Sequence, residues 1–225
     1  MGERRGPLLR LLHLVSPSLP TGAFAYSQGL EWAIAKGWVQ DAPSLQAWLA
    51  DLIHHGLARV DIPILRRMYT ACLAQEESAF ARWCDLLMAM RESSELRLEE
   101  QNRGRAMATL LEGLQISFSM TEKGIIERSQ LAGFAMAAAR WNIPLSEAAP
   151  GYAWSWLENQ VLTGIKTIPL GQTQGHQILM ALDPAVMTAV GQGLRLADND
   201  IGSSSPALAV ACSRHESQYT RLYRS

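Results

Sequence analysis

The sequence predicts an all-α fold, a single-domain helical bundle of roughly eight to ten helices. Hydrophobic residues make up 48% of the 225 residues, which is enough to bury a substantial core within one domain. They recur at the i, i+3, i+4, i+7 spacing of amphipathic helices, and no stretch alternates with the period of two that strands require. We therefore expect one domain over residues 1–225, with a flexible N-terminus at residues 1–7.

Helical spacing is continuous from Ser44 to about Leu73. Pro63 lies inside this pattern, and because proline lacks an N–H and clashes with the preceding turn, we expect either two helical pieces or one kinked helix. The apolar positions on this face are Leu45, Trp48, Leu49, Leu52, Ile53, Leu57, Val60, Ile62, Leu65, Met68, Tyr69 and Cys72.

Two further apolar stripes, within 83–90 and 107–114, lie on either side of a charged run. The run extends from Arg91 to Arg105 and predicts a solvated helix face. On that face Glu99 precedes Arg103 by four residues, the favourable order for a helical ion pair.

The second half of the chain continues in helices. Residues 122–140 are rich in Ala and Gly, which predicts close packing against a neighbouring helix. Pro144 ends that element, and Ser146 is expected to cap the next helix. Helical spacing resumes over residues 173–195, with an expected break at Pro184.

Charge and hydropathy exclude several classes of protein. Twenty Lys and Arg residues against 21 Asp and Glu leave a formal net charge of −1, so no basic field is available to bind nucleic acid or an anionic membrane. No unbroken apolar run approaches the roughly 20 residues of a membrane span, and no signal-peptide core follows the start of the chain. A cytoplasmic location is therefore expected, with the cysteines Cys72, Cys84 and Cys212 reduced and buried.

Motifs for catalysis are incomplete. Lys166 and Thr167 match the end of a phosphate-binding loop, but both of its glycines are missing. His215 begins an HExxH-like sequence in which Tyr219 replaces the second metal-binding histidine. GxSxG is absent as well. We expect neither an enzyme nor a bound cofactor.

Metal binding remains an open alternative. His54 and His55 are adjacent, so on a helix they point about 100° apart and need a third ligand from elsewhere. Cys212 and His215 are three residues apart and could contact one ion, but two ligands make a weak site.

The segment Ser16–Glu31 is the most distinctive of the chain, because two prolines and two glycines constrain a bend before a helix. Ser27 is expected to be the N-cap of that helix. This segment and four others resemble the UreF family of urease accessory proteins, and the motifs recur in order nearly to the end of the chain. The other four are Asn102–Gly104, Gly164–Gln172, Asp200–Ser203 and Arg214–Ser225.

The resemblance implies a function that the residues alone do not. It implies a noncatalytic urease maturation chaperone that binds UreD (also called UreH), recruits and regulates the GTPase UreG, and supports nickel insertion into the urease apoprotein. A homodimer is expected. The alternatives are a nickel carrier that uses His54, His55, Cys212 and His215, and an enzyme of unknown type that uses Glu31, Asp61 or His215 as acid or base.

Three polar residues lie at breaks or loop ends, where side chains are accessible to a partner. Each also has a local interpretation: Glu31 favours a helix first turn, Asp61 caps the piece that starts at Pro63, and Lys166 is a solvated loop charge. The resemblance assigns these three residues, with His215, to the surface that faces the GTPase.

The last segment, 217–225, is expected to be a partner-binding tail that orders on binding and makes few contacts beforehand. It contains large side chains of the types favoured at interface centres. The resemblance assigns Tyr219, Arg221 and Leu222 to contacts with UreD. The chain also has Phe24 where family members often have Tyr, so a hydrogen bond from that hydroxyl is not available here.

Overall fold

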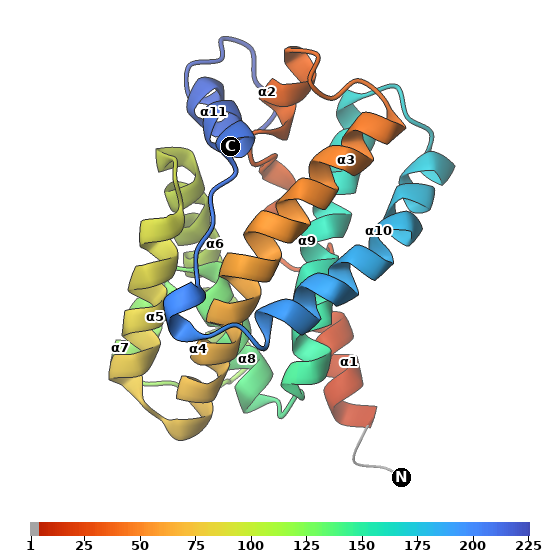
Figure 1. Cartoon of the computed structure of the whole chain (residues 1–225). Coiled ribbons are helices and arrows are strands. Elements are labelled where there is room, and N and C mark those ends of the chain that lie inside the picture. Colours follow the sequence, from red (N-terminus) through yellow and green to blue (C-terminus); the bar gives the residue numbers. More distant parts are fainter. Residues whose placement is uncertain (1–4) are drawn as a thin grey trace.

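The computed structural model describes residues 5–225, and the all-α prediction is confirmed: within that range the chain forms helices and no strands (Figure 1). The α-helices are α1 (Arg5–Leu14), α2 (Leu30–Ala35), α3 (Ala42–Leu52), α4 (Ile62–Ala74), α5 (Glu77–Met90), α6 (Ser94–Gly113), α7 (Met120–Ile126), α8 (Gln130–Arg140), α9 (Leu145–Thr167), α10 (Gln172–Gly193) and α11 (Pro206–His215). Short 3-10 helices occupy η1 (Ala23–Ala25) and η3 (Asp198–Asp200), and η2 (Ile53–Asp61) is π-helical.

The predicted kink at Pro63 takes the form of a π-helix. Helices α3, η2 and α4 follow one another without a loop, and Pro63 lies in the first turn of α4. Proline cannot donate to the carbonyl four residues earlier, which belongs to Arg59. Instead the N–H of Gly202 donates to that carbonyl (3.0 Å), and the Arg59 guanidinium donates to the carbonyl oxygens of Gly202 and Asp200 (both 3.2 Å). The Asp200–Ser203 motif therefore supplies a donor to the carbonyl with which Pro63 cannot pair.

The helices share one apolar core, with α8 at its centre. Every residue of α8 except Arg140 is buried, as the small-residue pattern predicts. Gly104 of α6 explains one close approach: a Cβ there would lie 2.5 Å from the carbonyl oxygen of Ile126 and 2.8 Å from the main-chain nitrogen of Ser129. The Asn102–Gly104 motif thus places α6 directly against the junction of α7 and α8.

Several local expectations are wrong. The N-cap of α2 is Gly29, not Ser27, and α9 begins after Pro144 without a cap from Ser146. Helix α10 continues through Pro184. The expected flexible N-terminus at 1–7 falls partly outside the described residues (1–4), and residues 5–7 belong to α1.

The run from Arg91 to Arg105 is not solvated throughout, because Glu99 and Glu100 are buried and pair with Arg103 of the same helix and with Arg91 at the end of α5. Within residues 5–225, no helix combines the length and apolar character that crossing a bilayer requires.

Candidate partner-binding site

The segment after α11 turns back onto the start of α2, where Glu31 accepts its main-chain hydrogen bonds. The N–H of Leu222 donates to Glu31 Oε1 (2.7 Å) and the N–H of Tyr223 donates to Oε2 (3.0 Å). Glu31 is only 7% exposed. A carboxylate that accepts two adjacent main-chain N–H groups fixes the path of the chain, since charge-assisted hydrogen bonds are about twice as strong as neutral ones.

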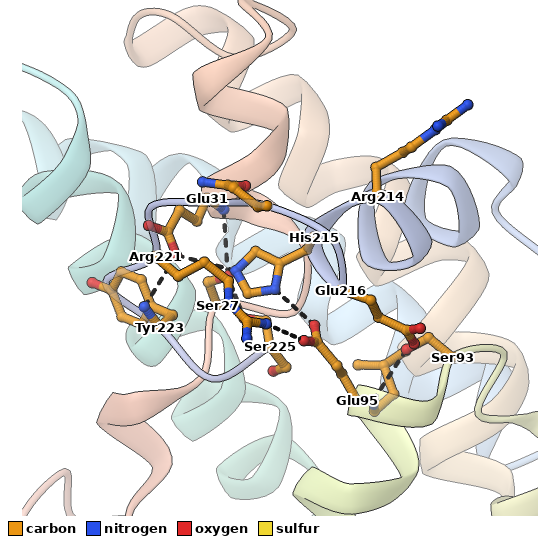
Figure 2. Close-up of polar contacts among 12 residues, drawn as sticks. Ser27, Glu31, Ser93, Glu95, Arg214, His215, Glu216, Arg221, Tyr223 and Ser225 are labelled. Atoms are coloured by element: carbon orange, nitrogen blue, oxygen red, sulfur yellow. Dashed lines mark hydrogen bonds and ion pairs between the residues drawn. The ribbon is translucent and has the colours of Figure 1, made fainter.

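His215, at the end of α11, lies between two carboxylates (Figure 2). Its Nε2 is 3.1 Å from Glu31 Oε2 and its Nδ1 is 2.7 Å from Glu95 Oε2. A neutral imidazole has a single N–H, so both contacts are hydrogen bonds only when the ring carries both protons. Arg221 donates to the other oxygen of Glu95 (2.5 Å). Glu31 and Glu95 therefore hold both the end of α11 and the segment that follows it.

The segment 222–225 also pairs with the residues that precede α2. The N–H of Arg224 donates to the carbonyl of Ala25 (2.8 Å), and the N–H of Ser27 donates to the carbonyl of Ser225 (2.7 Å). The Ser225 hydroxyl donates to Glu99 Oε2 (2.9 Å). Tyr223 and Ser225 are buried. This differs from the expectation that the tail makes few contacts, because its buried partners are carboxylates and carbonyls from distant parts of the chain.

Two glycines shape the Ser16–Glu31 segment so that Glu31 meets the tail. Gly22 and Gly29 have φ angles of 73° and 77°, in the left-handed region that favours glycine. A Cβ on Gly29 would lie 3.0 Å from the main-chain nitrogen of Cys212. The start of α2 therefore lies directly against α11, one turn before His215.

A second buried ion-pair cluster lies next to the first. Arg91 donates to Asp61 Oδ1 and to Glu100 Oε1, both at 2.6 Å. Arg103 donates to Glu99 Oε1 (2.8 Å). Glu99 is therefore shared, because its other oxygen accepts from Ser225. The adjacent residues Glu99 and Glu100 connect the tail to the kink at Asp61.

The carboxyl groups of Asp61 and Glu100 have opposite pKa shifts. Burial raises the pKa of Asp61 above its ordinary value, although Arg91 opposes the shift. Burial acts on Glu100 as well, but the guanidinium groups of Arg91 and Arg103 and the hydrogen bond from Ser129 outweigh it and lower the pKa. Glu100 also accepts from the Ser129 hydroxyl (3.0 Å), so its ionised form is better paired.

The structure brings together four of the seven residues singled out for partner binding. Glu31 and His215 are in contact, Arg221 shares Glu95 with His215, and Leu222 donates its N–H to Glu31. The side chain of Leu222 is 75% exposed.

The other three residues lie apart from this group. Asp61 is buried in the second cluster, and Tyr219 is fully exposed in the turn after α11. Lys166 is exposed, but it belongs to the last turn of α9 rather than to a loop. Gly164 lies within that helix, and its missing Cβ lets Leu45 of α3 approach closely.

The Glu99–Arg103 ion pair is confirmed, but the other contacts that hold these groups were not predicted. Arg91, Glu95, Glu99 and Glu100 belong to the charged run that was interpreted as solvated. One signal was available. Arg103 follows Glu99 by four residues, and Gly104 follows Glu100 by four. A glycine in a helix indicates that a neighbour approaches that face closely.

The residues proposed for metal binding do not converge. Among the described residues, no group of three or more His, Cys, Asp and Glu could hold a metal ion. The rings of His54 and His55 meet edge to face, with centroids 4.9 Å apart. Both ring nitrogens of His215 already contact carboxylates. Burial raises the pKa of the Cys212 thiol, which disfavours the thiolate that a metal requires.

The acid–base alternative has partial geometric support. Asp61 lines a small cavity with Gln28, Arg91 and Glu100, and its pKa is raised. Its carboxylate is already paired with Arg91, however, and neither Glu31 nor His215 lines that cavity. The three residues do not form one site.

Comparison with known proteins gives one consistent result. The family model described as UreF matches residues 39–183. The chain is 49% identical over 218 residues to the urease accessory protein UreF of Pseudomonas putida (strain W619), covering 97% of each chain. It is 45% identical over 222 residues to that of Alcanivorax borkumensis, covering 96% of this chain and 97% of the relative. For the protein of Klebsiella pneumoniae the identity is 41% over 217 residues, with 96% and 97% covered.

Proposed function

Because this chain belongs to the UreF family, we propose that it is a noncatalytic chaperone of urease maturation. In this role it binds UreD (UreH), recruits and regulates the GTPase UreG, and supports nickel insertion into the urease apoprotein. It acts in the cytoplasm as a homodimer. The observation that carries the proposal is similarity along nearly the whole chain to proteins named urease accessory protein UreF.

Exposure divides the candidate residues into two groups. Lys166, Tyr219, Arg221 and Leu222 are exposed, so their side chains are available for direct contacts: Lys166 with UreG, and the other three with UreD. A lysine in the last turn of a helix is favourably placed at the negative end of the helix dipole, which leaves its charge free for a partner without cost to the fold.

Glu31, Asp61 and His215 are buried and act indirectly in this proposal. Glu31 and His215 hold the tail in position, and Asp61 connects the kink between α3 and α4 to the same buried charges through Arg91. A partner that engages the tail therefore alters contacts that reach η2, and this gives the scaffold a physical route between its two partners.

A combined assay tests the function. The chain is expressed in a urease-positive bacterium that lacks its own accessory protein of this type, and urease activity and urease-bound nickel are measured. We expect both to be restored, and tagged UreD and UreG to co-purify with the chain. Restoration without either partner would refute the scaffold role, and failure to restore activity in a strain that contains soluble chain would refute the maturation role.

A further inference from the structure

A groove of about 810 Å³ lies between α2, α11 and the turn that follows α11. In Figure 1 these elements lie at the end of the bundle that is farthest from the start of α1. The groove has a volume in the upper part of the roughly 300–1,000 Å³ range of small-molecule sites, many times that of a single small anion. It is lined by Trp32, Ala35, Lys36, Val210, Arg214, Ser217, Gln218, Tyr219 and Thr220.

The charged side chains that line the groove are all positive. Lys36 and Arg214 are exposed, and neither forms an ion pair with any carboxylate of residues 5–225. Figure 2 shows Arg214 pointing away from the carboxylates that hold His215. No Asp or Glu lines the groove. On a chain whose formal charge is −1, two unpaired cations on one concave surface are complementary to a negatively charged ligand.

Aromatic side chains flank the two cations. Trp32 lies on one wall, where Trp38 packs edge-on against it with centroids 5.0 Å apart. Tyr219 lies on the other wall and is fully exposed. Half-buried Trp32, exposed Tyr219 and Arg214 are residue types enriched at interface centres, where they combine apolar contact with hydrogen bonding.

The geometry points to an extended acidic segment of a partner protein as the ligand of this groove. We propose that Lys36 and Arg214 bind carboxylates of that segment, while an apolar side chain between them packs against Trp32 and Tyr219. The size of the groove fits several residues rather than one small anion. This inference deepens the proposed function and rests on it only for placing the partner within the maturation assembly.

A peptide titration tests the groove in the isolated, full-length chain. The probe is a capped octapeptide of alternating glutamate and leucine, and its control is the lysine–leucine peptide of equal length. Binding is followed by the indole N–H resonance of Trp32, assigned with Trp32→Phe. We expect the acidic peptide to shift this resonance and the basic peptide to leave it unchanged. No shift, or equal shifts with both peptides, would overturn the proposal.

Charge reversal provides the matched comparison. The double variant K36E/R214E should bind the acidic peptide about tenfold more weakly or worse, because two attractive contacts become repulsive. The variant R82E/R105E reverses two exposed arginines on α5 and α6 and should keep the affinity of the parent chain. Exposed substitutions of this kind change stability little, and circular dichroism checks the fold. Equal affinities of the two variants would contradict the assignment.

The cellular assay separates this inference from the proposed function. If K36E/R214E loses peptide binding and also loses one co-purifying partner, the groove is the docking site of that partner. If the parent chain restores urease activity but the peptide does not bind, the maturation role stands and the groove assignment is wrong.

Discussion

The carboxylate of Glu31 and the imidazole of His215 are in direct contact, with 3.1 Å between Oε2 and Nε2, although 184 residues separate them in the chain. The same carboxylate accepts the main-chain N–H groups of Leu222 and Tyr223. One buried side chain therefore determines where α11 ends and where the tail goes. The Ser16–Glu31 and Arg214–Ser225 motifs lie near opposite ends of the chain, and each supplies part of this one hydrogen-bonded group.

Glu31→Gln tests this contact. The amide has one acceptor oxygen in place of two and adds an N–H that faces other donors, so we expect the free energy of unfolding to fall by about 2–3 kcal/mol. Urea unfolding measures the loss, and hydrogen exchange should show faster exchange at the amides of Leu222 and Tyr223. Glu147→Gln, an exposed glutamate in the first turn of α9, is the control and should change little. Protected tail amides in Glu31→Gln would show that other contacts hold the tail.

Acid should affect the two carboxylates bound to Arg91 in opposite ways. The pKa of Glu100 lies below its ordinary value of 4.5, so its stabilising contribution is present above that pH and is lost as the pH falls through the folded-state pKa. The pKa of Asp61 lies above its ordinary value of 3.8. Its contribution is therefore complete below pH 3.8 and is lost as the pH rises through the folded-state pKa.

Substitution by the neutral amide makes this difference measurable. At neutral pH we expect Glu100→Gln to lower the free energy of unfolding by about 3 kcal/mol, because it leaves a buried guanidinium partly unpaired, and Asp61→Asn to lower it less. The deficit of Glu100→Gln should shrink as the pH is lowered from neutral to a value below 4.5, where the parent loses the same charge on passing through the folded-state pKa. Urea unfolding at the two pH values checks both statements. Equal deficits at neutral pH, or a deficit of Glu100→Gln that does not change with pH, would contradict them.

Lys166 tests the proposed contact with UreG. Lys166→Ala should weaken co-purification of UreG and change the free energy of unfolding by no more than about 0.5 kcal/mol, since the side chain is exposed. Arg105→Ala, another exposed cation on a helix surface, is the control and should retain UreG. A large drop in melting temperature with normal UreG binding would indicate a structural role for Lys166.

The helices could be predicted from the sequence, whereas the buried charges could not, and the reason is distance along the chain. Apolar spacing is local, so the stripes around Leu45, Trp83 and Met107 indicate helices whatever lies elsewhere. Burial of Glu99 depends on Ser225, which is 126 residues away. The pattern near Glu99 looks the same whether or not such a partner exists.

Proline and glycine show the same limit. Local rules place a break at Pro63, but the chain stays helical through the π-helix that ends at Asp61, and the Arg59 carbonyl accepts from the N–H of Gly202. Lys166 was expected in a loop because Gly164 precedes it, yet Gly164 is helical and serves the approach of Leu45. A proline or glycine within a helical pattern marks a departure from the regular helix or a close contact, and only the packed structure shows which contact requires it.

Removal of the tail is the broadest test, because the structure and the proposed function make separate statements about it. Deleting residues 217–225 takes two N–H donors from Glu31, Arg221 from Glu95 and the hydroxyl donor of Ser225 from Glu99. The buried side chain of Tyr223 is lost as well. We expect the melting temperature to fall by about 6–12 °C, which corresponds to roughly 3 kcal/mol in a chain of this size. The helical core should remain folded, and thermal melting by circular dichroism measures both.

Loss of UreD from the truncated chain would not by itself assign the contact, since the truncation also disturbs Glu31 and His215. The double variant Tyr219→Ala/Leu222→Ala separates the two effects, because both side chains are exposed and neither packs in the core. It should melt close to the parent and still lose UreD, since two interface anchors of about 2 kcal/mol each amount to roughly three orders of magnitude in affinity. If this variant retains UreD, the tail is a structural element of the fold and the docking surface lies elsewhere.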